Sequence, residues 1–176
     1  MKKNYLKNFN LIKITEKDLK IILALRNQKK IRRMMINKNI IKFREHLNWF
    51  NNLKKSNFFH FYCFIKNKKI LGAGYASDFD KKKQFCYWGL YRDLRLKNKI
   101  KYGSILKYLL MEKLFSLKNI SYLKCKVVKR NKWVRQWYES WGHHYVYFNR
   151  HDQTHNLILT KAKWLEIRKY ILINKL

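Results

Sequence analysis

The sequence predicts a single α+β domain that spans residues 1–176, and two observations lead to this prediction. The spacing of apolar residues changes along the chain from helical to alternating and back to helical, as expected of mixed helices and strands. A hydrophobic content of 47% and an aromatic content of 16% over 176 residues are enough for one core of ordinary size. No repeat, linker or low-complexity segment divides the sequence, so we expect no second domain.

The N-terminal third predicts one strand and two helices. Residues 9–15 alternate apolar and polar side chains, which is typical of a strand. Thr15 can cap the next helix, with Asp18 as a weaker substitute for the capping-box glutamate, and this helix ends near Arg26. A polar, basic interval precedes a second helix at about Phe43–Lys55. The buried stripe of the second helix consists of Leu47, Phe50 and Leu53, flanked by His46 and Trp49.

The middle of the chain predicts three strands. The β-prone run Phe58–Ile65 is followed by a turn at Asn67-Lys68 and by a partner strand over residues 70–77. Two glycines in that partner strand favour a bulge or a close backbone approach. A charged turn leads to a third strand, Phe85–Tyr91. Because the connections are short, we expect an antiparallel meander.

The segment 96–118 predicts an anion site at the start of an amphipathic helix. Its apolar residues at helical spacing are Ile105, Leu106, Leu109, Leu110 and Leu114, which places the helix start near Ser104. A glycine and a serine, Gly103 and Ser104, at a helix start leave several backbone N–H groups unpaired, and the helix dipole adds to their attraction for anions. Nearby lysines favour a phosphate or diphosphate: Lys97, Lys99 and Lys101. The alternative is an ordinary surface turn with solvated lysines.

The C-terminal third predicts a strand, a short helix, a hairpin and a last helix. Asn131 opens the short helix and Gly142 closes it in a C-cap position. The strands of this part are Tyr122–Val128, Tyr145–Phe148 and Asn156–Thr160, and the last helix runs from Trp164 onward.

The formal net charge of +32 would ordinarily indicate nucleic acid or an anionic membrane as a partner. The composition favours another interpretation, because Lys, Asn, Ile, Phe and Tyr are all abundant, proline is absent and glycine is scarce, as AT-rich coding produces on any scaffold. The lysines are also spread along the chain without a dense basic tail. We therefore expect no specific nucleic-acid partner.

The cysteines indicate a reducing compartment. Cys63, Cys86 and Cys125 are far apart in apolar, strand-like contexts and offer no metal-ligand spacing, so we expect buried free thiols and no metal site. The N-terminus lacks an apolar signal-peptide segment, and no run is long enough to cross a bilayer. These observations predict a cytoplasmic protein without a membrane partner.

The order of elements, together with the spacing Asn131-x6-Tyr138-x3-Gly142, resembles the GCN5-related N-acetyltransferase (GNAT) superfamily from Phe9 to about Trp164. The resemblance is closest to the branch that acetylates a 4-amino-4,6-dideoxy UDP-sugar in pseudaminic acid synthesis. Three stretches carry this finer resemblance: Arg26-Asn27 with Met34-Met35, Arg44-Glu45-His46-Leu47 with Trp49, and Gly89-Leu90-Tyr91 leading into Tyr102-Gly103-Ser104-Ile105-Leu106. Ribosomal-protein acetyltransferases share the early Arg-Asn pair.

One segment departs from the superfamily pattern. The diphosphate loop usually reads Arg/Gln-x-x-Gly-x-Gly/Ala, whereas the aligned residues here are 98–103, with Asn98 at the first position and Lys101 in place of the first glycine. Lysine takes positive φ less readily than glycine, which would distort the backbone cradle. Its ammonium group could instead meet the diphosphate.

The resemblance implies a central mixed, mostly antiparallel, splayed sheet flanked by helices. It also implies transfer from acetyl-CoA, without a metal, to the 4-amino group of a UDP-4-amino-4,6-dideoxy-N-acetyl sugar. Such a product would serve flagellin glycosylation or another glycan, and the oligomeric state, with a homodimer among the options, stays open. A strand edge beside a splayed neighbour can pair with pantetheine amides, and a backbone N–H near Leu90 or Tyr91 can polarise the thioester carbonyl.

The resemblance also assigns site residues. Tyr138 is the expected general acid that protonates the leaving thiolate, although a half-buried helix aromatic would look the same in sequence. The residues expected to bind acetyl-CoA are Leu90, Tyr91, Lys97, Lys101, Tyr102, Gly103, Ser104 and Asn131. The residues expected to bind the acceptor are Arg26, Met35, His46 and Tyr91. No general base stands out, since Glu45 equally suits a solvated helix face.

Two other functions fit the sequence. One is acetylation of a peptide N-terminus, for instance that of a ribosomal protein, but a groove for a basic peptide should be acidic and this chain is basic. The other is a basic nucleic-acid-binding protein that keeps an inactive acetyltransferase fold. That protein would bind arbitrary duplex with a steep salt dependence and would not respond to acetyl-CoA.

Overall fold

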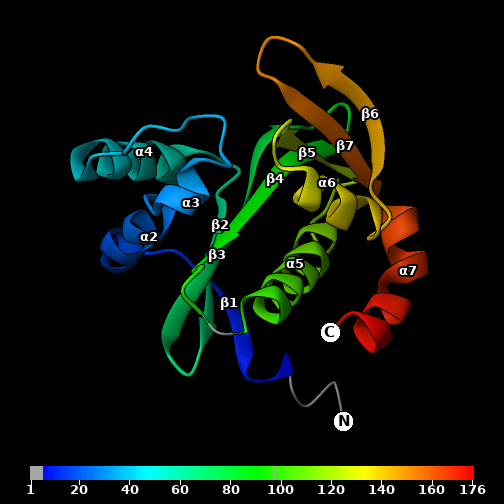
Figure 1. Cartoon of the computed structure of the whole chain (residues 1–176), viewed down its shortest axis with the longest axis horizontal. Coiled ribbons are helices and arrows are strands. Elements are labelled where there is room, and N and C mark those ends of the chain that lie inside the picture. The colour runs from blue at the N-terminus through cyan, green and yellow to red at the C-terminus, as the bar shows by residue number, and fades with distance from the viewer. Residues whose placement is uncertain (1–5, 97) are drawn as a thin grey trace.

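The computed structural model describes residues 6–96 and 98–176, which form a twisted sheet between two layers of helices (Figure 1). The strands of this described part are β1 (Phe9–Lys13), β2 (His60–Lys66), β3 (Lys69–Asp80), β4 (Phe85–Arg92), β5 (Tyr122–Val128), β6 (His144–Asn149) and β7 (Thr154–Thr160). The helices are the 3-10 turn η1 (Glu16–Asp18), α2 (Leu19–Arg26), α3 (Lys29–Arg32), α4 (Phe43–Lys55), α5 (Lys99–Phe115), α6 (Lys132–Glu139) and α7 (Lys161–Asn174).

The sheet order is β1-β2-β3-β4-β5-β7-β6, and only the β4–β5 pair is parallel among the described strands. The predicted meander of β2, β3 and β4 is confirmed. The turn at Asn67 and Lys68 takes positive φ at both residues, 47° and 64°, as the tight hairpin between β2 and β3 requires. The sheet is therefore the mixed, mostly antiparallel sheet that the family resemblance implies.

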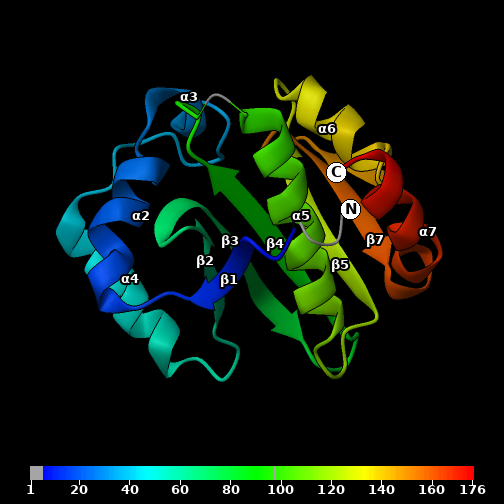
Figure 2. The same cartoon turned by 90° about the horizontal axis from the view of Figure 1, so that it is seen from below.

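The two faces of the sheet bury alternate side chains of the same strands. Phe61 and Cys63 of β2 pack under α2 and α4, whereas Tyr62 and Phe64 face the side of α5 and α7. Figure 2 shows α2 and α4 on one side of the strands and α5 on the other, with α7 beyond it. All three cysteines are buried and free, as predicted.

Helix α5 differs from the prediction for residues 96–118 in its start and in its burial. It begins at Lys99 after an N-cap at Asn98, five residues before the predicted start near Ser104. It is also buried on nearly every side from Gly103 to Tyr108, so it is a central helix and not an amphipathic one. The reason is that it packs on β1, β3 and β4 and also against α7.

Smaller differences lie in the other helices. The basic interval after α2 contains the helix α3, which the sequence did not predict because a four-residue helix with one buried side chain, Ile31, has no apolar stripe. Helix α7 begins at Lys161, three residues before the predicted Trp164, with the Thr160 hydroxyl accepting the Lys163 N–H at 3.2 Å. His46, predicted to flank the stripe of α4, is itself buried.

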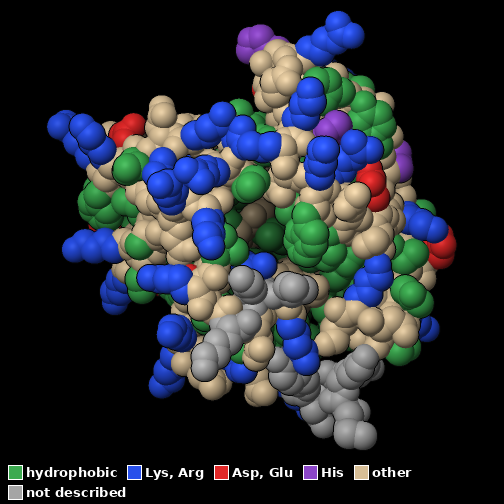
Figure 3. Space-filling view, viewed as in Figure 1, with side chains coloured by type: hydrophobic (Ala, Val, Ile, Leu, Met, Phe, Trp, Pro, Cys, Tyr) green, Lys and Arg blue, Asp and Glu red, His purple; other side chains and the backbone are tan. Residues whose placement is uncertain are grey.

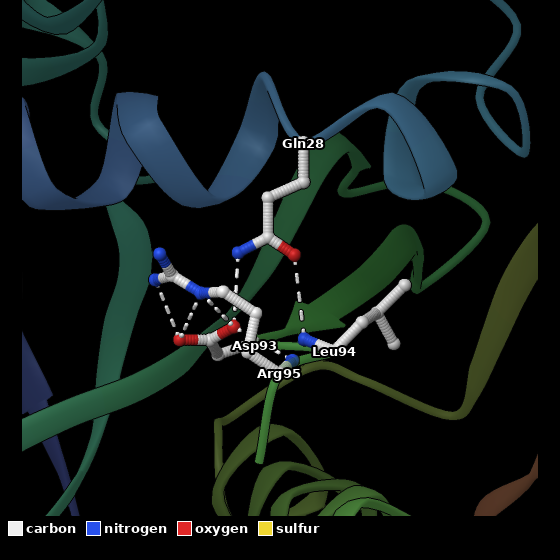
Figure 4. Close-up of polar contacts among 4 residues, drawn as sticks. All are labelled: Gln28, Asp93, Leu94 and Arg95. Carbon is white, nitrogen blue, oxygen red and sulfur yellow. Dashed lines mark hydrogen bonds and ion pairs between the residues drawn. The ribbon is translucent and has the colours of Figure 1, made fainter.

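A polar cluster ties the α2–α3 junction to the loop between β4 and α5 (Figure 4). Gln28 donates its amide to the Asp93 carboxylate at 3.0 Å and accepts the Leu94 N–H at 3.3 Å. Arg95 donates to both Asp93 oxygens, at 2.8 Å from Nη2 and 2.9 Å from Nε. These hydrogen bonds from Arg95, despite partial burial, hold the pKa of Asp93 well below its usual range. The cluster thus fixes the segment that leads into α5.

None of the described helices is both long enough and apolar enough to span a bilayer. Within the same residues, no group of three or more His, Cys, Asp or Glu side chains could hold a metal ion.

Candidate active site

The parallel strands β4 and β5 separate after a short stretch of pairing. They pair only where residues 85–87 meet residues 122–124, and β4 then continues from Trp88 to Arg92 without a partner on that side among the described strands. The resulting first cavity has a volume of about 310 Å³. Figure 3 shows the molecule hollowed near the middle of this face, with apolar side chains at the rim and Lys and Arg side chains around it. The splayed sheet that the family resemblance implies is therefore present.

The first cavity collects predicted residues from distant parts of the chain. Leu90 and Tyr91 come from β4, Asn131 from the cap of α6, Tyr138 from α6 itself and Gly103 from α5. Asn131 makes no side-chain capping hydrogen bond, so its amide is not used to hold the helix. The structure thus brings the predicted acid and part of the predicted cofactor set to one place.

Tyr138 is 6% exposed and stacks among aromatic side chains. Its ring centroid lies 4.9 Å from that of Trp88 and 5.4 Å from that of Trp137. Burial raises the pKa of the Tyr138 hydroxyl well above its usual value, so the phenol is protonated at neutral pH. Helix α6 ends shortly after Tyr138. Gly142 takes φ +80° there, and the His143 N–H donates to the Tyr138 carbonyl at 3.2 Å.

The predicted diphosphate segment is arranged differently from the expectation. Ser104 lies inside α5 and is buried, so the predicted exposed N–H groups at Gly103 and Ser104 are not at a helix start. The helix N-terminus lies at Asn98 instead, and Lys101 in its first turn is exposed. Tyr102 packs its ring 5.5 Å from that of Phe9, toward β1 and outside the residues that line the first cavity. Lys97 lies outside the described residues.

Arg92, at the end of β4, was not predicted as a site residue. It lines the first cavity, and its Nε lies 2.8 Å from the position that a Cβ on Gly103 would take. Its Nη1 is buried with no hydrogen-bond partner among the described residues. Burial lowers the pKa of Arg92 from its usual value, but a guanidinium stays protonated in proteins. A half-buried cation with a buried, unused donor is suited to an anionic ligand group.

A second cavity of about 880 Å³ adjoins the first and shares Met35, Trp88 and Tyr91 with it. All four predicted acceptor residues line this second cavity: Arg26, Met35, His46 and Tyr91. They come from α2, the α3–α4 loop, α4 and β4, so the fold brings together residues that the sequence separates.

Unused hydrogen-bonding groups of Arg26 and His46 lie at the second cavity. Arg26 donates Nη2 to the Asn37 carbonyl at 2.7 Å, while its Nη1 is buried without a partner in the described chain. His46 stacks on Trp49 at 4.9 Å, and its Nε2 is likewise buried and unpartnered within those residues. Burial, with a smaller effect of the Arg26 charge, lowers the pKa of His46, so its imidazole is neutral at neutral pH.

The carboxylates at the second cavity are Glu45 and Asp78. Glu45 accepts the Lys42 N–H at 2.7 Å and thus caps α4. Asp78 is exposed and accepts the Ser77 hydroxyl at 2.9 Å. The carboxylates among the described residues of this cavity therefore give no stronger candidate base than the sequence did.

A third, basic cavity of about 540 Å³ adjoins the second and shares Met35, Ile36 and Val128 with it. Its cationic and titratable lining residues are Lys38, Lys129, Arg130, Lys132 and His151. Arg130 donates to the carbonyls of Arg33 and Met35, which fastens the loop after α3 to the turn after β5. The one carboxylate in this lining, Asp152, is paired with Lys126 at 3.1 Å.

Comparison with solved structures places this arrangement in a known fold. The spermidine N-acetyltransferase from Vibrio cholerae, solved with CoA and spermine, matches with a TM-score of 0.78 at 15% identity, covering 90% of this chain and 99% of that one. FdhC, a nucleotide-linked sugar GNAT solved in its apo form, matches with a TM-score of 0.74 at 21% identity over 93% and 92% of the two chains. The N-acetyltransferase PseH from Campylobacter jejuni matches with a TM-score of 0.67 at 18% identity over 88% and 99%.

No family model and no curated protein sequence matches the chain. The similarity is therefore one of structure, and it shows that the chain has the fold of the GCN5-related N-acetyltransferases.

Proposed function

We propose that this protein is an acetyl-CoA-dependent N-acetyltransferase that acetylates the 4-amino group of a UDP-4-amino-4,6-dideoxy-N-acetyl sugar, as in pseudaminic acid synthesis. One observation carries the proposal: the cavity opened by the β4–β5 divergence, where Tyr138 lies, joins a second cavity that leads to a basic one. The first cavity suits the thioester of acetyl-CoA, and the second and third cavities suit an anionic acceptor that carries an amine.

The residues of the first cavity fit acetyl-CoA. The unpaired edge of β4 from Trp88 to Arg92 can hydrogen-bond the pantetheine amides in the manner of an added strand. A backbone N–H near Leu90 or Tyr91 would polarise the thioester carbonyl. Arg92, at the end of β4, and Lys101, in the first turn of α5, would meet the diphosphate, and their charges would compensate for the missing loop glycine.

Tyr138 would give its hydroxyl proton to the sulfur of the leaving coenzyme A. Burial keeps the phenol protonated, and the same apolar surroundings raise the pKa of a thiol in the cavity, so donor and acceptor stay matched. His46 and Arg26 would hold the acceptor through their unused nitrogen atoms at the second cavity. Neutral His46 can also accept a proton from the attacking amine.

The charges around the acceptor side favour a nucleotide sugar over a polyamine or a basic peptide. The cations at the second cavity are Arg26 and Lys126, and Lys126 is paired with Asp152. The cavity also carries two carboxylates, Glu45 and Asp78, so the excess of positive charge lies in the adjoining basic cavity. The adjoining basic cavity would hold the sugar diphosphate through Lys129, Arg130 and Lys132. A polycation such as spermidine would meet like charges on this path.

Acceptor competition tests the proposal. With saturating acetyl-CoA, we expect kcat/KM for the UDP-amino sugar to exceed that for spermidine and for a ribosomal-protein N-terminal peptide by at least about tenfold, since charge pairing of this kind contributes about 1.5–3 kcal/mol. The measurement is coenzyme A release, with product mass confirming addition of one acetyl group. Omission of each substrate and the Tyr138→Phe variant serve as controls. Faster acetylation of spermidine would reject the nucleotide-sugar acceptor.

A thermal-shift measurement distinguishes an acetyl-CoA-dependent enzyme from a nucleic-acid-binding protein with the same fold. Acetyl-CoA is expected to raise the melting temperature at physiological salt, because a ligand that binds only the folded state stabilises it. If acetyl-CoA leaves the melting temperature unchanged while arbitrary duplex DNA binds with a steep salt dependence, the binding protein is the correct function instead.

A further inference from the structure

A lysine lies in the interior of the protein beside the proposed general acid. Lys107, on α5, is 0% exposed, and its Nζ has no hydrogen-bond partner among the described residues. The Nζ lies 4.2 Å from the ring centroid of Tyr138, 4.5 Å from that of Trp141 and 4.7 Å from that of Trp137. The ring of Trp88 follows at 5.8 Å. An apolar side chain would fill this position without an unpaired amine, so the lysine calls for a function.

The aromatic rings determine where a positive charge can sit in this interior. Ring faces attract an ammonium ion, which offsets part of the cost of burying it. Burial lowers the pKa of Lys107 well below the usual lysine value, the Cys125 thiol opposes this shift and the Lys175 charge adds to it. His143, stacked on Tyr138 at 5.3 Å, is also buried, and burial followed by the Lys107 charge lowers its pKa well below the usual value. The Lys107 amine is the group that four aromatic rings surround, which is the arrangement that favours a cation at this position.

We propose that Lys107 is a positioning residue for the acetyl transfer proposed above, whose ammonium group stabilises the phenolate that Tyr138 becomes when it gives up its proton. In the step, the acceptor nitrogen bonds to the acetyl carbon, the carbon–sulfur bond breaks, and the sulfur takes the Tyr138 proton. The proton shed by the acylated nitrogen then returns to the phenolate through water. In this proposal Lys107 transfers no proton and acts through the charge of its ammonium form.

The first test replaces the amine without changing the packing volume much. Lys107→Met is expected to lower kcat at least about tenfold while KM for acetyl-CoA changes less than about twofold, because the lost charge acts on the transition state and not on cofactor binding. Lys113→Met, at an exposed lysine of the same helix, makes the same change in net charge and is expected to leave both constants unaltered. Equal kcat for Lys107→Met and the wild type would overturn the proposal.

The pH dependence of kcat distinguishes a charge effect from a packing effect. The active form has Lys107 protonated, so the wild-type rate is expected to fall as pH rises through the lowered pKa of Lys107. Lys107→Met should lack this decline, whereas Lys113→Met should keep it. A decline that persists unchanged in Lys107→Met belongs to another group and contradicts the proposal.

Thermal stability gives a readout that needs no activity. Burial lowers the pKa of Lys107 in the folded protein, so below the unfolded pKa near 10.4 the unfolded chain binds a proton more readily than the folded protein does. The free energy of unfolding therefore decreases as pH falls from about 10.4 toward the folded pKa. Lys107→Met should therefore melt at the same temperature as the wild type or higher, and its advantage should grow as pH falls from about 10 toward the lowered pKa. A variant that fails to fold, or an advantage independent of pH, would show that the amine is structural and would overturn the proposal.

The outcomes separate this inference from the function on which it rests. A wild-type protein that acetylates none of the acceptors rejects the proposed acetyl transfer, whatever the melting curves show. An active wild type with an equally active Lys107→Met variant rejects the positioning role alone.

Discussion

Replacing Tyr138 with phenylalanine is expected to lower kcat by about 100- to 1000-fold while leaving the Kd for acetyl-CoA nearly unchanged. The reason is that a positioned acid typically contributes about 10²–10⁴-fold, and phenylalanine keeps the ring that packs between Trp88 and Trp137 but removes the proton. The decisive measurement pairs steady-state kinetics on the UDP-amino sugar with acetyl-CoA binding by calorimetry.

Tyr170→Phe is the matched control for this change, because Tyr170 is 59% exposed on α7 and lines none of the three cavities. It should leave both kcat and Kd unaltered. A Tyr138→Phe variant that loses acetyl-CoA affinity and kcat in equal measure would show that the hydroxyl supports the cavity and does not donate a proton.

Replacing Arg92 with glutamine is expected to raise KM for acetyl-CoA by about 10- to 100-fold, since a charge-assisted hydrogen bond contributes about 1.5–3 kcal/mol. Arg92 is half-buried against Gly103, and its Nη1 has no hydrogen-bond partner among the described residues, so this nitrogen is left to bind a ligand. The measurement is KM for acetyl-CoA at saturating acceptor, together with KM for dephospho-coenzyme A thioesters to locate the phosphate concerned.

Arg150→Gln removes the same charge from an exposed turn between β6 and β7 and controls for the lower net charge of the protein. Its KM for acetyl-CoA should equal that of the wild type. If both variants weaken acetyl-CoA binding to the same degree, the effect comes from the overall positive field and Arg92 has no specific role.

Local periodicity predicted most of the fold. The bounds predicted for α4 and for β5 agree with the structure, because each has an apolar pattern with a clear start and stop. The divergence of β4 from β5 could not be derived from the strand patterns themselves. It depends on where pairing ends, after Tyr87 and Lys124, and the expectation of a splayed sheet came from the family resemblance.

The predicted start of α5, near Ser104, was wrong for a physical reason. Gly103 and Ser104 are typical of a helix start, but here the glycine serves close packing, since a Cβ would meet the Arg92 side chain. The helix already begins at Lys99 because tertiary packing of α5 on the sheet overrides the local glycine signal. The helix start to which the anion-site prediction refers therefore lies at Lys99 and not at Gly103.

The two residues that the sequence analysis missed differ in kind. Arg92 is one arginine among many basic residues, and only its place beside Gly103 distinguishes it. Lys107 carried a signal that could have been used, because it falls three and four residues before the buried Leu110 and Met111, on a helix face that is otherwise apolar. A charged residue in that position is rarely buried without a function or a partner.

The most direct test of the account is a crystal structure of the protein with acetyl-CoA. We expect pantetheine to lie between β4 and β5, with the thioester sulfur within about 3.5 Å of the Tyr138 hydroxyl oxygen and the diphosphate beside Arg92. A cofactor bound elsewhere, or a Tyr138 hydroxyl directed away from the sulfur, would contradict it.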